Sequence, residues 1–354
     1  MANVYLKEAV TRIQSECGGN QYLEYCVSTC QGWRNTQEDA HIAMLDFEKD
    51  THIFAVFDGH NGPEVSEYAR RHLPEYLRTS KAYKNGEIHI GLKEAFLQLD
   101  AALLLPEAYE ELKKIRHDAY PELYEMVPGI TSGTTAIVTI IKNNRIYVAG
   151  VGDSRCLLYR KNQILLLNKD TTPDDPIENK RILESGVKII NGRIDGKINL
   201  SRALGDHMFK MFDKLPIFKQ PMLGDPFIFI EPHTSFDQFL LLICDGIWNA
   251  MDNIAVVQFV NERIGTKTLN QITEEVIERI LPKVMPERGV KGKDNMTIMI
   301  IKFFTTKNSS KIFYKNTTLR KINEDIIAKN NETKKFQKKN KLFEKDKSKG
   351  ILFL

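Results

Sequence analysis

The chain has 354 residues, of which 42% are hydrophobic and 27% are charged, and this composition excludes fibrous and wholly disordered proteins. Its formal net charge of +4 is unevenly distributed, because residues 307–354 hold 14 Lys and Arg against 5 Asp and Glu. The remaining body is mildly acidic, which favours cations over nucleic acid as partners.

Cysteine usage and hydropathy predict a soluble protein of the cell interior. The cysteines are a sparse, odd set without a CxxC pair, which indicates packing roles in a reducing compartment and argues against a disulfide framework or a zinc site. They are Cys17, Cys26, Cys30, Cys156 and Cys244. No segment approaches the ~18 consecutive apolar residues of a transmembrane segment, and with Ala2 at the second position we expect no N-myristoylation. We therefore expect a cytoplasmic or nuclear location.

Short apolar or alternating runs predict strands, and stretches with a 3.6-residue period predict helices. In chain order we expect strands at 22–30, 40–47 and 52–57, helices over 63–73 and 92–103, strands at 134–141, 145–149, 156–160, 163–167, 227–230 and 239–244, a helix over 269–280, and a strand at 296–303. Helices that arrive in pairs between blocks of strands favour an α+β fold with antiparallel sheets over alternating βαβ units.

The end of the chain has a different composition. From about residue 305, Asn and Lys dominate and apolar residues are too scattered for a core, which predicts a mobile, disordered basic tail over 305–354. Its TKKFQKKNK run is open to two interpretations, a solvated tail or a nuclear-import signal. The predicted organisation is a lead-in at 1–21, one domain at 22–304 and this tail.

Acidic residues stand at the ends of strongly apolar strands. The strand at 40–47 begins after Glu38 and Asp39, and the strand at 52–57 ends before Asp58, so an antiparallel hairpin makes these acids neighbours. The strand at 239–244 ends at Asp245, and the strand at 296–303 begins shortly after Asp294. If those two strands also pair, a second set of carboxylates meets at a sheet end.

Carboxylates this close repel one another unless a cation lies between them, and oxygen-only ligands suit magnesium, manganese or calcium. Two such ions ~3.5–4 Å apart lower the pKa of a shared water and hold a phosphoryl oxygen, which is the chemistry of phosphoester hydrolysis. Arg34, four residues before Glu38, offers a fork of donors to phosphate, and His60 is suited to protonate a leaving alkoxide. Taken singly, an Asp-Gly pair indicates only a turn, Arg34 a surface ion pair and His60 a loop residue.

Seven motifs follow one another along the chain: QGWRNTQEDAH, FAVFDGHNG, SGTTA, VAGVGDSR, GRIDGKINLSRALGD, LLLICDGIW and GKDNMT. In order and style they resemble the metal-dependent type-2C protein serine/threonine phosphatases, the PPM family, over residues 22–304. The resemblance implies a single catalytic domain with two stacked antiparallel β-sheets flanked by helices on both faces, an α-β-β-α sandwich. It also implies two Mg²⁺ or Mn²⁺ ions at one end of the sandwich.

The resemblance assigns roles to the acids found above. Asp58 would bridge both ions, with Glu38 and the Gly59 carbonyl on one of them, and Asp245 and Asp294 on the other. A hydroxide that bridges the ions would attack the phosphate directly, without a phosphoenzyme intermediate.

Three further residues take roles through the same resemblance. Asp39 would orient the metal-bound water, Arg34 would clamp the phosphate and His60 would act as general acid. The substrates would be proteins phosphorylated on serine or threonine, nucleic acid would not be required, and a monomer is expected.

Three departures from the family pattern qualify these implications. Asn249 stands where the family usually has an aspartate that, with Asp153 and Asp245, helps to hold a weaker third metal, so that ion should bind less well here. Thr171 and Thr172 replace a usual His-Lys pair. Residues 105–129 form a longer, helix-rich link, interpreted as a surface elaboration or a docking site.

Two other functions remain open. A pseudophosphatase, which keeps the fold as a phosphoprotein-binding regulatory module, is suggested by the departures at Asn249, Thr171 and Thr172. A metal-dependent phosphoesterase acting on nucleic acid is suggested by the basic tail. Turnover of a phosphopeptide distinguishes the first of these from an active enzyme.

Overall fold

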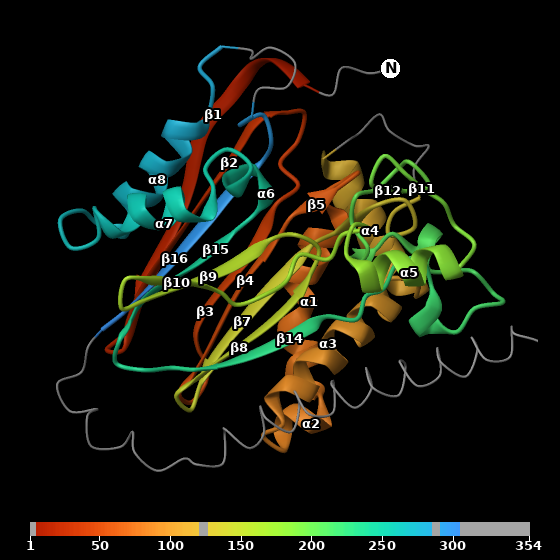
Figure 1. Cartoon of the computed structure of the whole chain (residues 1–354), viewed down its shortest axis with the longest axis horizontal. Coiled ribbons are helices and arrows are strands. Elements are labelled where there is room, and N and C mark those ends of the chain that lie inside the picture. Colours follow the sequence, from red (N-terminus) through yellow and green to blue (C-terminus); the bar gives the residue numbers. More distant parts are fainter. Residues whose placement is uncertain (1–4, 120–126, 285–290, 305–354) are drawn as a thin grey trace, which may run out of the picture. The chain divides into compact units, whose positions relative to one another are not determined.

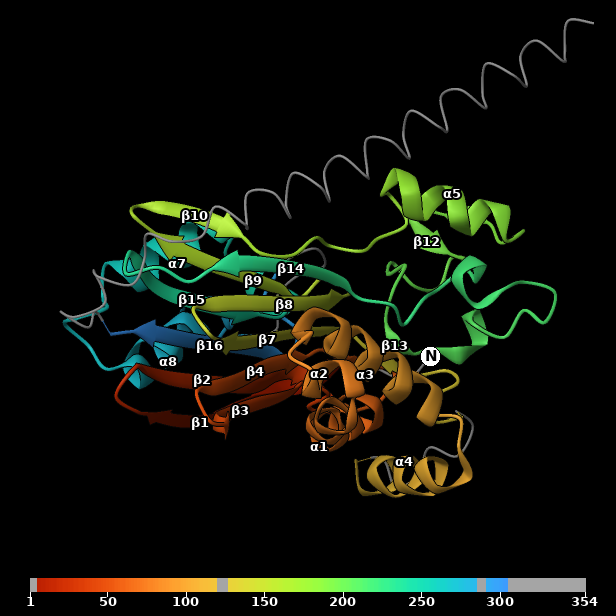
Figure 2. The ribbon, with the colours of Figure 1, turned by 90° about the horizontal axis from the view of Figure 1, so that it is seen from below.

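A computed structural model describes residues 5–119, 127–284 and 291–304 of the chain. Most strands belong to two antiparallel sheets, which Figures 1 and 2 show as two layers. In sheet order, the six-stranded sheet contains β1 (Tyr5–Gly19), β2 (Leu23–Arg34), β16 (Met296–Phe303), β15 (Asp237–Ile243), β9 (Arg155–Arg160) and β10 (Gln163–Leu166). The five-stranded sheet contains β14 (Phe227–Pro232), β8 (Arg145–Val151), β7 (Ala136–Lys142), β4 (Thr51–Phe57) and β3 (Ala40–Glu48).

The alternation of side chains along β4 explains how the layers are built. Phe54 and Val56 point into the core between the two sheets, where they join residues of β2, β15 and β16. Ile53, Ala55 and Phe57 point the other way, into a second core beneath helices. A strand that is buried on both faces is apolar throughout, and β4 is buried at all seven positions.

Helices cover both outer faces of the paired sheets. The five-stranded sheet is covered by α1 (Glu64–Thr79), α2 (Lys81–Lys84) and α3 (Ile88–Ala102), and α4 (Pro106–Ala119) packs against α1. The six-stranded sheet is covered by α6 (Asp245–Trp248), α7 (Asn253–Asn261) and α8 (Leu269–Ile280) (Figures 1 and 2). The apolar residues at four-residue spacing in α1, Val65, Ala69 and Leu73, are all buried. The predicted α+β sandwich of two antiparallel sheets between helices is confirmed.

A small lobe and two short pairings complete the described chain. The lobe contains α5 (Pro176–Glu184) and the hairpin of β11 (Ile189–Ile190) and β12 (Arg193–Ile194), around a third apolar core. A three-stranded ladder joins β13 (Leu204–Gly205), β6 (Gly133–Thr134) and β5 (Gly59–His60). Strand β5 follows β4 after the single residue Asp58, so its pairing with β6 holds the segment that carries Asp58 and His60 in place.

Strand β1 differs from the sequence prediction. Residues 5–19 lie in the segment interpreted as a lead-in, and they form an edge strand that pairs with β2 over Tyr5–Gly19. Most of its side chains are exposed or half-buried, so the segment has no apolar face to reveal a strand.

The cysteine prediction is wrong for two of the five residues. Cys17 on β1 lies directly opposite Cys26 on β2, and the two form a disulfide. Cys30, Cys156 and Cys244 are free and buried, as packing residues are.

Two other predictions meet the limits of the described residues. Residues 106–119 of the predicted helix-rich stretch form α4, whereas 120–126 lie outside the described residues, as does the tail from 305. Within the described ranges, no helix has both the length and the apolar character to cross a membrane.

Candidate active site

The strand pairings bring the predicted acids to one end of the sandwich. Ala40 pairs with Phe57, which sets Glu38 and Asp39 beside Asp58. Strands β15 and β16 are also antiparallel neighbours, with Ile243 opposite Ile298. Asp245 and Asp294 follow and precede these strands, so both pairs of carboxylates meet as the antiparallel arrangement requires.

These acids surround one cavity of about 780 Å³. Eight of the nine site residues predicted from the sequence line it: Arg34, Glu38, Asp58, Gly59, His60, Asp153, Asp245 and Asp294. The ninth, Asp39, lies behind the wall within 4.8 Å of the Asp58 carboxylate and the Cys244 thiol. Its Oδ2 accepts a hydrogen bond of 2.6 Å from Thr297.

The electrostatics of this cluster favour bound cations. Burial, together with repulsion from Asp39 and Asp245, raises the pKa of Asp58 well above its usual value. Burial and the neighbouring acids raise the pKa of Asp245 to about 8, and the same causes raise that of Asp39 to about 7. Buried carboxylates without a counter-charge are unfavourable, and no described residue donates a hydrogen bond to Asp39 Oδ1. An all-oxygen set of this kind fits hard divalent cations.

Glycine is required at position 59 by the approach of two backbone segments. A Cβ at Gly59 would lie 2.4 Å from the carbonyl oxygen of Glu38. That segment is held in place by Asn295, whose Oδ1 accepts from the Glu38 N–H at 2.9 Å and whose Nδ2 donates to the carbonyls of Gln31 and Thr36. Asn295 is a site residue that the sequence analysis missed, although it lies within the quoted GKDNMT motif.

The Arg34 side chain lines the cavity, and its guanidinium pairs with the Asp294 carboxylate. Its Nη2 donates to Asp294 Oδ2 at 2.7 Å, and its Nε lies 2.7 Å from Asp294 Oδ1. Its side chain is 38% exposed, so the guanidinium is accessible to a solute in the cavity while it pairs with one of the predicted metal ligands.

His60 has a partner that the sequence analysis also missed. Its Nε2 lies 2.6 Å from Oδ2 of the buried Asp206. Burial lowers the pKa of His60, but the Asp206 charge and hydrogen bond outweigh it and raise the pKa above its usual value. Asp206 lies 146 residues away in the sequence, and its only signal is its place in the quoted SRALGD motif.

Comparisons with known proteins show the family of the chain. The family model described as protein phosphatase 2C matches residues 23–284. A relative named probable protein phosphatase 2C 21 from Arabidopsis thaliana is 36% identical over 329 residues, which cover 84% of this chain and 92% of the relative. The chain belongs to the protein phosphatase 2C family.

Other similarities extend over the same region. The probable protein phosphatase 2C 6 of Paramecium tetraurelia is 37% identical over 305 residues, which cover 84% of this chain and 99% of that protein. A crystal structure of a phosphatase from Toxoplasma gondii matches with a TM-score of 0.66 at 23% identity, covering 83% of this chain and 96% of the other. At that identity the structural match supports the fold.

Asn249, which stands where this phosphatase 2C family usually has an aspartate, contacts one of the predicted metal ligands. Its Nδ2 donates to Asp245 Oδ2 at 3.0 Å. An amide therefore stabilises the Asp245 carboxylate at the place where the resemblance implies a second acid. Asp153 is buried nearby, and burial with the Asp170 charge raises its pKa to about 6.

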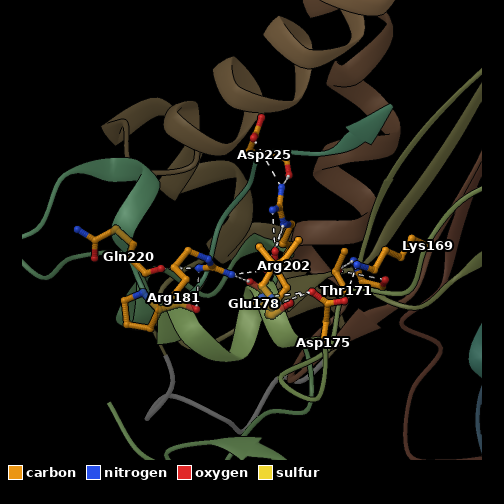
Figure 3. A network of polar contacts seen from close by, with 12 residues as sticks. Lys169, Thr171, Asp175, Glu178, Arg181, Arg202, Gln220 and Asp225 are labelled. Atoms are coloured by element: carbon orange, nitrogen blue, oxygen red, sulfur yellow. Dashed lines mark hydrogen bonds and ion pairs between the residues drawn. The ribbon is translucent and has the colours of Figure 1, made fainter. Parts of the chain in front are cut away.

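Thr171, at the second departure, is a buried structural residue. Its Oγ1 accepts from the Gly152 N–H at 2.7 Å, and its carbonyl accepts from the Ser201 N–H at 2.9 Å. It thus joins the start of the lobe to the loop before β9. Figure 3 shows it beside the polar network that anchors α5.

The lobe itself forms one wall of the phosphatase cavity. Five of its residues, in the segment from β12 to the end of the loop that follows, line the cavity: Arg193, Lys197, Ile198, Asn199 and Leu200. The fully buried Glu178 on α5 holds the lobe, because it pairs with Arg181 and with Arg202, whose Nη2 donates to Glu178 Oε1 at 2.7 Å (Figure 3).

Proposed function

We propose that this protein hydrolyses phosphoserine and phosphothreonine in protein substrates, with Mg²⁺ or Mn²⁺ bound by the acid cluster. The observation that carries the proposal is the convergence of the strand-end carboxylates, Arg34 and His60 on one cavity in a chain of the phosphatase 2C family. The groups that would hold the ions are Glu38, Asp58, the Gly59 carbonyl, Asp245 and Asp294.

When bound, a pair of hard divalent cations supplies a water of lowered pKa and offsets the negative charge of the phosphoryl oxygens. The planar guanidinium of Arg34 leaves Asp294 and binds two phosphoryl oxygens of the substrate. Asp39 accepts a hydrogen bond from the attacking water and so orients it.

His60 handles the leaving group. Water adds to phosphorus as the bond from phosphorus to the serine or threonine oxygen breaks, and that oxygen needs a proton. Because Asp206 engages Nε2 and stabilises the imidazolium, His60 donates the proton from Nδ1. The products are inorganic phosphate and the free hydroxyl side chain.

The test is hydrolysis of a phosphoserine peptide by the purified full chain with Mn²⁺. We expect turnover that EDTA abolishes and that Asp58→Asn and Asp245→Asn reduce to background, because each removes a predicted ligand. Asp213→Asn, a change of the same chemistry at an exposed residue of the loop after β13, should leave turnover unchanged. Manganese-saturated wild-type protein without turnover would contradict the proposal and favour a phosphoprotein-binding pseudophosphatase.

A further inference from the structure

Helix α4 places a buried guanidinium beneath the loop that carries His60. Arg116, in the last turn of α4, has a side chain that is only 5% exposed. Its Nη2 donates to the Asn61 carbonyl at 2.5 Å and to Glu64 Oε1 at 2.6 Å, and its Nε donates to the same carboxylate oxygen at 3.1 Å. Glu64 is the first residue of α1 and is fully buried.

The loop above this ion pair is shaped to fit it. Asn61 adopts a left-handed conformation with φ of 58°, and its Nδ2 donates to the Thr131 carbonyl at 3.1 Å. Gly62 follows with φ of 134°, and a Cβ there would lie 2.2 Å from Glu64 Oε2 and 2.5 Å from Arg116 Nη2. The turn from the cavity into α1 therefore packs directly on the guanidinium and the carboxylate.

A second arm leads from Glu64 to the partner of His60. The Ser132 hydroxyl donates to Glu64 Oε1, and the Ser132 carbonyl accepts from the Asp206 N–H at 2.8 Å. Asp206 in turn holds His60. Two sets of contacts therefore lead from the Glu64 carboxylate to His60. One runs through Arg116 to the Asn61 carbonyl, next to His60 in the chain, and the other runs through Ser132 and Asp206 to the imidazole.

We propose that Arg116 is a positioning residue for His60 in the phosphatase reaction, an inference that rests on the proposed function. Removing one member of a buried ion pair leaves the other charge without compensation. A small displacement of a catalytic group costs orders of magnitude in rate. Helix α4, the described part of the stretch that the sequence analysis interpreted as a surface elaboration or a docking site, therefore supports the active site.

The choice of variants separates positioning from stability. Arg116→Met leaves the buried Glu64 carboxylate without its ion-pair partner, so both stability and activity should fall. Arg116→Met with Glu64→Gln removes both charges, so the melting temperature should return close to the wild-type value while the Asn61 carbonyl still lacks its donor. Arg116→Lys should restore activity only in part, because an ammonium lacks the planar fork.

The leaving group gives the readout that a purely structural role would not move. A phosphoserine peptide needs a proton on its leaving oxygen, whereas p-nitrophenolate leaves without one. In the Arg116→Met/Glu64→Gln variant we expect kcat for the phosphopeptide to fall about tenfold to a hundredfold. KM and kcat for p-nitrophenyl phosphate should change far less, and amide hydrogen exchange of the loop from Asp58 to Gly62 should accelerate.

Glu111→Gln is the matched control, because it weakens the partly exposed contacts from α4 to Arg71 and His72 and spares Arg116. It should leave all of these measurements unchanged. Equal losses on both substrates in the double variant, or a full phosphopeptide rate with unchanged exchange, would overturn the inference. Wild-type protein that turns over neither substrate would instead contradict the proposed function, and the exchange of the loop would still decide whether Arg116 orders it.

Discussion

At the scale of single residues, the end of β4 shows why an apolar strand stops at Asp-Gly-His. Asp58 faces other carboxylates, Gly59 passes against the backbone of Glu38, and His60 turns to Asp206. The absence of a Cβ is required at Gly59, and the proposed function adds a ligand charge at Asp58 and a proton carrier at His60. A simple turn would not require this combination of Asp58, Gly59 and His60.

Gly59→Ala tests the close approach. The added methyl group would meet the Glu38 carbonyl, which Asn295 prevents from moving away. We expect a loss of about 1–3 kcal/mol in the free energy of unfolding, measured with urea, and a large loss of phosphatase activity. Gly86→Asn, at an open position where φ is 84°, is the control and should leave phosphatase activity unchanged. Wild-type stability in Gly59→Ala would show that the backbone relaxes there.

Asn249→Asp tests the departure at the position where the resemblance implies a weaker third metal. The change replaces a donor to Asp245 with a like charge, so the cavity should need an additional cation to be stable. We expect the activity of the variant to rise over a higher Mn²⁺ concentration range than that of the wild type. Asn249→Ala, which removes the donor without adding charge, is the control. Identical Mn²⁺ curves for Asn249→Asp and wild type would exclude a role in cation binding.

At the scale of elements, the lobe around α5 is held by charge as much as by apolar packing. Its apolar core is small and separate from the two main cores. Glu178 is fully buried between two arginines, and Arg202 also stacks on Phe227 with 4.1 Å between the guanidinium carbon and the ring centre. Because this lobe forms a wall of the cavity, its local stability should affect substrate binding under the proposed function.

Arg202→Met should loosen this lobe. The change leaves Glu178 buried with one partner fewer, at a cost of about 3–5 kcal/mol. We expect faster amide exchange in α5 and the β11–β12 hairpin, with little change in β15 and β16. Lys180→Met, at an exposed position of the same helix, is the control. Exchange that rises equally in all elements would mean that the lobe does not open independently.

The same ion pairs give the lobe a pH dependence. Burial raises the pKa of Glu178, but the hydrogen bond and charge of Arg202 outweigh it, so the pKa is lowered from its usual 4.5. The stabilisation is therefore complete above pH 4.5 and is lost as the pH falls through the lower pKa of the folded state. Exchange in α5 should accelerate in acid before the sandwich unfolds.

At the scale of the whole molecule, the acid cluster sets how stability depends on pH and on cations. Asp245, with its pKa raised from 3.8 to about 8, keeps its proton in the folded state over a range where the unfolded state releases it. Without cations, stability should therefore fall as the pH rises from about 4 to about 8. If divalent cations bind the ionised carboxylates, as proposed, they should reverse this loss.

The melting temperature with Mn²⁺ and with EDTA measures this effect. The increase that Mn²⁺ produces should be larger near pH 8 than in mild acid, because protons compete with the cation. Asp58→Asn should reduce the increase, and Asp213→Asn should preserve it. A Mn²⁺ effect that is independent of pH would show that the cation binds elsewhere.

Deletion of residues 307–354 tests the predicted domain boundary. We expect unchanged kcat/KM and melting temperature, because the family match ends at residue 284 and β16 ends at Phe303. Any effect should concern location, as a nuclear-import signal would cause. Loss of folding on this deletion would place the boundary further along the chain.

Local patterns in the sequence determined most strands of the two sheets, the helices α1, α3 and α8, and six of the eight predicted residues that meet in the cavity, whereas α2, α6 and α7 were not predicted. A hairpin such as β3–β4 pairs neighbours in the chain, so the position of Glu38 beside Asp58 follows from the apolar runs and a short turn. The apolar runs likewise placed Asp245 and Asp294 at the ends of β15 and β16, whereas Gly59 and Asp153 were expected only from the resemblance to the family. Periodicity reports a buried face, and these strands are buried.

Only the tertiary structure decided which distant polar side chains meet. Asp206 reaches His60, and Arg116 reaches Glu64, because separate segments fold onto one loop, and no local period encodes such contacts. Strand β1 and its Cys17–Cys26 disulfide escaped prediction for a related reason, since an exposed edge strand buries no face that a pattern could reveal. The apolar residues that become buried form local patterns in the sequence, whereas the pairing of distant polar side chains depends on the completed fold.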